Sequence, residues 1–239
     1  MTMAEQEQEQ ERERERDTVR ALRALEDARV PVRLRATMAV GSRPDPAYVG
    51  PLVVRCAVEP DFQVREMLTW ALTRHAPDLT VPALVAELRS ETAQARSQAL
   101  HTLSKIGDRR ARPAITRALL TDPDDEVARS AWRAAVVLVD PGPPAGPVRQ
   151  DERQELAAVL STQLGRGPRA TQLSLSRAMV ALGEVIVPEL TAAGTHADPA
   201  VRAHALATER LLHDPDAGFE YAIEEAKRVV ALGPDGHEG

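Results

Sequence analysis

The chain has 239 residues, of which 43% are hydrophobic but only 3% aromatic, and its formal net charge is −6. A core rich in Ala, Leu and Val and poor in aromatic side chains favours closely packed helices over a β-sandwich or barrel. The single cysteine, Cys56, excludes an intramolecular disulfide and a metal site built from several cysteines. We therefore expect an all-α protein without a resident metal or other cofactor.

The charge is concentrated at the N-terminus. Residues 1–17 carry seven acids and three arginines, a net charge of −4, which leaves −2 for the rest of the chain. Such a nearly neutral body gives no global electrostatic reason to bind nucleic acid or an anionic membrane. The chain also lacks an apolar run of about 18 residues and a signal-peptide core. We expect a cytoplasmic protein that binds neither membrane nor nucleic acid.

The acidic segment 1–17 has no apolar residue after Ala4, so it lacks a face that could dock to a core. Glu9, Glu11 and Glu13 each have an arginine three positions on, a spacing that supports a solvated helix. The segment is interpreted as a disordered or fraying tail, with a partner-binding segment as the alternative. An amphipathic helix is predicted to begin at about Thr18.

Apolar helical stripes recur along the rest of the chain. They open at equivalent dipeptides spaced by 32, 31, 32, 43 and 31 residues: Val32-Arg33, Val64-Arg65, Ala95-Arg96, Val127-Ala128, Ala170-Thr171 and Val201-Arg202. A second helix of each unit is predicted to start at a proline, in the column Pro51, Pro82, Pro113 and Pro188. This periodicity predicts an α-solenoid, a superhelix of about six helix pairs.

The solenoid is expected to span residues 18–232, followed by a polar tail over 233–239. The one long step contains a Pro/Gly-rich insertion at 140–150, which cannot be helical between Asp140 and Pro147. It is interpreted as a surface loop, with a hinge or binding loop as the alternative. We expect the array to divide into two blocks there.

Three motifs point to a known repeat. They are Asp61-Phe-Gln-Val-Arg65, Asp198-Pro-Ala-Val-Arg202, and Ile106-Gly-Asp continuing to Pro113. Together they resemble the short HEAT-like repeat named after the phycobilin lyases, over about residues 30–214. The resemblance implies that the repeated Arg and Asp are structural and form a ladder between neighbouring turns.

The ladder also follows from electrostatics, because an arginine in the first turn of a helix faces an unfavourable helix dipole and should be held by carboxylates. We expect Ala128 and Thr171 to interrupt this ladder. Its predicted members are Arg33, Arg65, Arg96 and Arg202 with Asp61, Asp78, Asp108 and Asp198.

Enzymatic alternatives lack their motifs in this sequence. A di-iron hydroxylase would need several His-Glu pairs, and the chain has one, His237-Glu238. A DNA-glycosylase-like enzyme would need a basic, aromatic-bearing surface, and a bilin-lyase-like enzyme a recognisable tetrapyrrole pocket. No hydrolase or phosphate-loop motif is present. We therefore predict that the chain is not an enzyme, with no catalytic residues and no small-molecule substrate.

The predicted function is a non-catalytic scaffold or adaptor that binds a protein partner through the concave surface of its second helices. A regulatory or nucleic-acid-associated module is the alternative function. The same residues could also form only a solvated face. The residues predicted to contact the partner are Arg55, Glu87, Arg89, Arg117 and the exposed aromatic Trp70.

Overall fold

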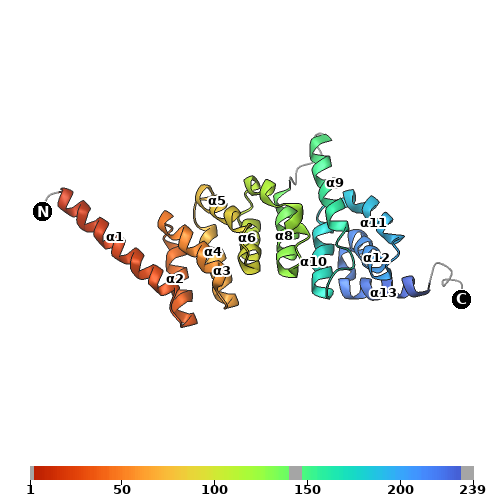
Figure 1. Cartoon of the computed structure of the whole chain (residues 1–239), viewed down its shortest axis with the longest axis horizontal. Coiled ribbons are helices and arrows are strands. Elements are labelled where there is room, and N and C mark those ends of the chain that lie inside the picture. The colour runs from red at the N-terminus through yellow and green to blue at the C-terminus, as the bar shows by residue number, and fades with distance from the viewer. Residues whose placement is uncertain (1–2, 140–146, 233–239) are drawn as a thin grey trace. The chain divides into compact units, whose positions relative to one another are not determined.

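The computed structural model describes residues 3–139 and 147–232, which fold into helices and turns without a β-strand in these ranges. The chain divides into two compact units, unit 1 over Met1–Ala114 and unit 2 over Ile115–Gly239. Figure 1 shows the helices of each unit, coloured from red at the N-terminus to blue at the C-terminus.

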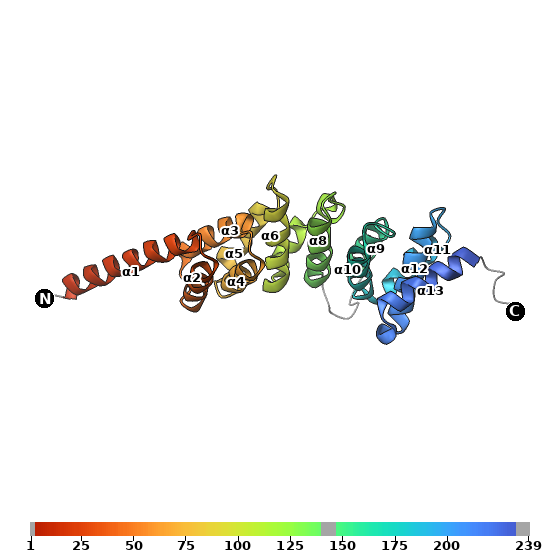
Figure 2. The ribbon, with the colours of Figure 1, turned by 90° about the horizontal axis from the view of Figure 1, so that it is seen from below.

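Unit 1 packs its helices in pairs. Helices α2, α4 and α6 lie side by side, while α3 packs against α4, α5 and α6, and α1 packs against α2 at the N-terminal end. Figure 2 shows this succession from a second direction. The bounds are α1 (Met3–Leu25), α2 (Val30–Ser42), η1 (Pro46–Tyr48), α3 (Val49–Val58), α4 (Phe62–Thr73), α5 (Pro77–Glu87), α6 (Ala93–Ile106) and η2 (Arg109–Ala114).

Unit 2 repeats the arrangement. Helix α10 packs against α8 and α12, and α12 packs against α11 and α13. Trp132 is fully buried in this unit and donates its indole N–H to the carbonyl of Leu120 at 2.8 Å. The bounds are α7 (Arg117–Leu120), α8 (Asp125–Leu138), α9 (Pro147–Ser161), α10 (Arg169–Val180), η3 (Gly183–Ile186), α11 (Val187–Gly194), α12 (Pro199–His213), η4 (Pro215–Ala217) and α13 (Phe219–Leu232).

The predicted all-α fold of HEAT-like helix pairs is confirmed. The first helices of the pairs are α2, α4, α6, α8, α10 and α12, and each opens with one of the equivalent dipeptides of the sequence. Each of these helices buries an apolar stripe, as the 3.6-residue period of the sequence requires. After α6, the chain forms the 3-10 helix η2 and the four-residue helix α7 in place of one full second helix.

The proline column needs a correction. Pro51 lies in the first turn of α3, but Pro82 lies inside α5, which begins earlier at Pro77. Pro77 occupies the helix start, where its missing N–H costs nothing, so the helix begins one turn before the expected proline. Pro113 lies in the 3-10 helix η2 and opens no α-helix.

The segment boundaries also differ. Helix α1 runs continuously from Met3 to Leu25, so the helix extends through the acidic segment instead of starting near Thr18. The division into units falls between Ala114 and Ile115, before the Pro/Gly-rich insertion. That insertion lies outside the described residues from 140 to 146, and so does the tail over 233–239.

Candidate functional site

The arginines of the repeated dipeptides, which we call the column arginines, share one hydrogen-bonding geometry. In each, Nη1 donates to the two backbone carbonyls that lie six and five residues earlier, in the turn before the helix. The donor–acceptor distances run from 2.7 to 3.0 Å. These arginines are Arg33, Arg65, Arg96 and Arg202. Each guanidinium therefore satisfies two carbonyls that the turn leaves without a backbone partner.

The aspartates that were predicted to hold these arginines make hydrogen bonds and ion pairs with other groups. Asp61 and Asp198 stand at the N-caps of α4 and α12, where each carboxylate accepts a backbone N–H of its own helix. Asp78 and Asp108 both pair with Arg110, at 2.7 and 2.5 Å. An aspartate just before a helix is within reach of the unpaired N–H groups of the first turn. Asp61 and Asp198 therefore bond their own helices and not the column arginines.

One column arginine, Arg33, also binds the carboxylate of Glu59, which was not among the predicted ladder residues. Arg33 donates from Nε and Nη2 to the two oxygens of Glu59, each at 2.8 Å, and Arg55 donates to Glu59 Oε2 at 2.9 and 2.6 Å. The Glu59 side chain is completely buried. Burial alone would raise the pKa of Glu59, but the bonds from Arg33, the Asp61 N–H and Arg55 lower it below its ordinary value.

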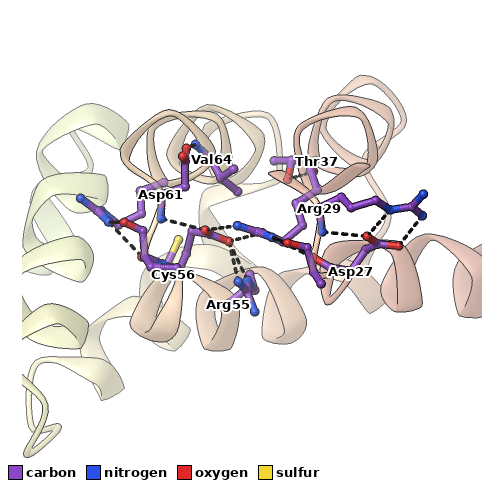
Figure 3. A network of polar contacts seen from close by, with 12 residues as sticks. Asp27, Arg29, Thr37, Arg55, Cys56, Asp61 and Val64 are labelled. Carbon is purple, nitrogen blue, oxygen red and sulfur yellow. Dashed lines mark hydrogen bonds and ion pairs between the residues drawn. The ribbon is translucent and has the colours of Figure 1, made fainter. Parts of the chain in front are cut away.

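Figure 3 shows how this network joins neighbouring helices, with Asp27, Arg55, Asp61 and Cys56 around it. The Asp61 N–H donates to Glu59 Oε1 at 2.9 Å, so the carboxylate also fixes the start of α4. From α6, the Gln94 amide donates to the carbonyls of Cys56 and Glu59 at 3.1 and 2.9 Å. Glu59 thus connects α2, α3, α4 and α6 in unit 1.

The expected interruption at Ala128 is filled by another arginine. Arg166, from the turn before α10, donates Nη2 to the carbonyls of Asp122 at 2.6 Å and Pro123 at 3.1 Å. These carbonyls lie six and five residues before Ala128, the positions that a column arginine would satisfy. Arg166 also pairs with Asp125 at 2.8 Å. The prediction of a broken ladder at Ala128 is therefore wrong.

At the second interruption, Thr171, the side-chain amide of the neighbouring residue Gln172 donates to turn carbonyls. Gln172 donates Nε2 to the carbonyl of Gly167 at 3.2 Å and, at 3.5 Å, to that of Gly165. The buried Thr171 hydroxyl donates to Asp125 at 3.3 Å. At Ala128 both carbonyls therefore have a replacement donor, whereas at Thr171 the Gln172 amide of the same helix reaches only one of the two equivalent carbonyls, that of Gly165.

The predicted contact residues differ in exposure. Arg55 is mostly buried through its bonds to Glu59, and Trp70 is 38% exposed with its ring against Gly41. Glu87 is half-buried and Arg89 is exposed. Arg117 is exposed in unit 2, whereas the other four belong to unit 1. Their role in binding stays a prediction.

An apolar groove lies beside Arg55, between α1 and α3, and we call it the α1–α3 groove. It has a volume of about 600 Å³ and is lined by Leu22, Leu25, Glu26, Gly50, Pro51, Val54, Arg55 and Val58. Val54 and Val58 are 63% and 61% exposed. Sequence reasoning missed these valines, although their spacing of four residues on a helix starting near Pro51 was a usable signal.

The fold and the turn contacts define a helical repeat protein in which guanidinium groups cap the carbonyls of the turns before its first helices. The repeat class is identified by a match of residues 51–136 to the family of HEAT repeats. Residues 51–136 thus carry HEAT repeats, in agreement with the HEAT-like repeat that the motifs predicted. A comparison with curated proteins finds no match.

Two solved structures are similar to the chain. Human deoxyhypusine hydroxylase in complex with glycerol has 19% identity and a TM-score of 0.44, with 91% of this chain and 95% of that chain covered. The complex of CpcE and CpcF of phycocyanin lyase from Nostoc sp. has 15% identity and a TM-score of 0.45, with 90% and 89% covered. Both are structures of enzymes, which contradicts the prediction that this chain is not an enzyme.

Two further findings concern metal-binding groups and membrane-spanning helices. Within residues 3–139 and 147–232, no group of three or more His, Cys, Asp or Glu side chains is placed to hold a metal ion. No helix in the described part of the chain is long and apolar enough to cross a membrane.

Proposed function

We propose that this HEAT-repeat protein is a scaffold that binds a protein partner through unit 1, on the side formed by the second helices. The observation that carries the proposal is the pair of exposed valines, Val54 and Val58, beside the α1–α3 groove. The occupant that fits is a partner segment carrying aliphatic side chains on one face. Such helix-in-groove recognition reads side chains at spacings of three and four residues.

Burial of the exposed valines would contribute to the binding free energy of a partner. Removing one valine side chain from water contributes about 1.5–3 kcal/mol, so covering Val54 and Val58 supplies a useful part of a micromolar affinity. Arg55 adds shape to the groove wall, because its guanidinium is fixed on Glu59 while the side chain lines the groove. A wall that is already ordered loses little side-chain entropy when a partner docks.

The test compares matched surface variants. The full chain, Val54→Glu and Val137→Glu are each used to capture proteins from the native host, and the captured protein is then titrated in purified form. Val137 is the control because it is 47% exposed on α8 in unit 2. We expect Val54→Glu to abolish binding of the purified partner and Val137→Glu to leave it unchanged.

Equal binding by both variants would place the contact elsewhere and refute the proposal. A gel shift at low salt distinguishes the protein-binding scaffold from the alternative, a nucleic-acid-associated module. Binding to nucleic acid that weakens steeply as salt is added would favour that alternative.

A further inference from the structure

Unit 1 has a second groove on another side of α1, between α1 and α2, which we call the α1–α2 groove. Its volume is about 420 Å³, and small aliphatic side chains form much of its lining, among them Ala21, Ala24, Val32 and Ala39. Small side chains let another helix approach closely, so this lining is compatible with a docked helix that carries short aliphatic residues.

The rim of the α1–α2 groove is positively charged. Arg20, Arg35 and Arg43 line it and are exposed, and Asp17 is its one acidic lining residue, which gives the rim a net charge of +2. Arg35 donates Nε to the carbonyl of Pro31 at 3.2 Å, which leaves its Nη groups free to bind a ligand. Arg20 and Arg43 have no ion-pair partner among the described residues.

We propose that the α1–α2 groove binds an acidic amphipathic helix of a protein partner. Alanine and other small aliphatic residues of that helix would cover the apolar floor, while flanking Glu or Asp side chains would pair with Arg20, Arg35 and Arg43. The proposal deepens the proposed scaffold function, on which it rests, by stating the chemistry of a partner. Complementary charge steers association and fixes the orientation of the docked helix.

The acidic segment of the chain itself is not the occupant. Helix α1 is continuous from Met3 to Leu25, so residues 5–11 cannot bend back to a groove that the same helix lines at Ala21 and Ala24. A second copy could present those residues, but from 5 to 16 they include no apolar side chain to cover the floor. An amphipathic partner satisfies both the floor and the rim.

Three fluorescein-labelled peptides test this, with anisotropy measured against the full chain. The first is a designed helix with Ala and Leu at positions i, i+3, i+4 and i+7 and Glu on both flanks. The second replaces every Glu by Lys, and the third is residues 1–16 of this chain. The protein variants are Arg20→Glu, Arg43→Glu and the control Arg74→Glu, which changes an exposed arginine outside the groove.

We expect the Glu peptide to bind, with affinity that falls as salt rises. Arg20→Glu or Arg43→Glu should each weaken it by about tenfold or more, while Arg74→Glu leaves it unchanged. Failure of the Glu peptide to bind, equal binding of the Lys peptide, or equal loss with Arg74→Glu would each overturn the proposal. Equally tight binding of peptide 1–16 would also overturn it and assign the groove to a second copy.

The two proposals fail separately. Val54→Glu changes the α1–α3 groove and leaves the lining of the α1–α2 groove intact. Loss of the purified partner with Val54→Glu, without loss of the Glu peptide, is the pattern that supports both proposals. If the Glu peptide fails while the partner still depends on Val54, only the inference about the α1–α2 groove is lost.

Discussion

Unit 1 satisfies the turn carbonyls in one way, whereas unit 2 uses both that way, at Arg202, and a second one. In unit 1, the arginine that caps two carbonyls before each first helix comes from that helix, as with Arg33, Arg65 and Arg96. In unit 2, helix α8 has Ala128 at this position, and Arg166 reaches the equivalent carbonyls from the next repeat. The comparison indicates that the repeat requires a donor for two turn carbonyls rather than an arginine at a fixed place in the sequence.

The polar centres of the two units differ in charge. In unit 1, the buried Glu59 carboxylate is held by Arg33 and Arg55. In unit 2, the buried His204 accepts the Gly165 N–H at Nδ1, at 2.9 Å, and its Nε2 lies 3.0 Å from the hydroxyl of Ser176. Burial lowers the pKa of His204 to about 4. One centre is therefore ionised at neutral pH and the other is not.

The largest expected effect is that of Glu59→Ala. This change leaves Arg33 buried without its carboxylate, so we expect a loss of about 3–5 kcal/mol in the free energy of unfolding of unit 1. The matched change in unit 2 is Asp125→Ala, which removes a pair whose carboxylate is 35% exposed. We expect it to cost about 1 kcal/mol through the ion pair, because exposed pairs contribute little.

The two tryptophans allow each unit to be followed separately. Trp70 belongs to unit 1 and Trp132 to unit 2, so Trp132→Phe leaves a reporter of unit 1 and Trp70→Phe a reporter of unit 2. Urea unfolding of Glu59→Ala and Asp125→Ala in these backgrounds gives the two losses. An equal cost for both variants would contradict the contrast between a buried and a half-exposed carboxylate.

The next effect is the response to acid. Because the folded pKa of His204 is about 4, against 6.5 without the fold, the unfolded chain takes up a proton first as pH falls below 6.5. This group should reduce the stability of unit 2 by about 3 kcal/mol between pH 6.5 and 4. The lowered pKa of Glu59 acts on unit 1 only below its ordinary value of 4.5.

The acid response is measured as the free energy of unfolding at pH 7.0, 5.5 and 4.5 with each tryptophan reporter. Between pH 7.0 and 5.5, we expect the Trp132 signal to report a loss larger than the Trp70 signal does. The His204→Gln variant keeps hydrogen-bonding groups without the titration and should flatten the slope of unit 2. A slope that persists in this variant would assign the response to another group.

A smaller effect is expected at Gly41, where α2 and α4 approach closely. A Cβ atom added there would lie 2.4 Å from Trp70 Cζ3 and 3.0 Å from the Ala71 backbone. We therefore expect Gly41→Ala to destabilise unit 1 by about 1–3 kcal/mol, as overpacking does. Gly50→Ala is the control, because nothing lies within 4 Å of its added Cβ. Equal effects of the two changes would show that α4 moves aside without cost.

Sequence reasoning predicted the helix pairs because a stripe of period 3.6 is a local property that the core then buries. It also found the column arginines, since their spacing equals the repeat. It missed Glu59 as the partner of Arg33, because the two are 26 residues apart and meet only when α2 packs against α4, the helix that follows Glu59. Sequence spacing alone does not reveal which carboxylate reaches a guanidinium across two helices.

Arg166 was missed for a related reason. It stands outside the repeat column, in a turn whose flanking glycines adopt positive φ angles of 82° at Gly165 and 68° at Gly167. Glycine tolerates this backbone, and the sequence Gly-Arg-Gly was the available signal. The exposed valines of α3 were missed because the spacing of apolar residues along a helix does not show which of its faces a neighbouring helix covers.

The most direct test of this account is a double-mutant cycle at Ala128 and Arg166, with the unfolding free energy of unit 2 measured in the Trp70→Phe background. We expect Arg166→Ala to destabilise unit 2 by about 1–3 kcal/mol, because it leaves the carbonyls of Asp122 and Pro123 without their donor. Ala128→Arg alone should also destabilise it, since two guanidinium groups would compete for the same carbonyls.

In the double variant, an arginine returns to the column position while the space of Arg166 is vacated. We expect the double variant to be more stable than Arg166→Ala, with a coupling energy of about 1–2 kcal/mol in the favourable direction. Additive losses in the double variant would contradict the claim that a donor for the two carbonyls, and not its place in the sequence, is what this turn requires.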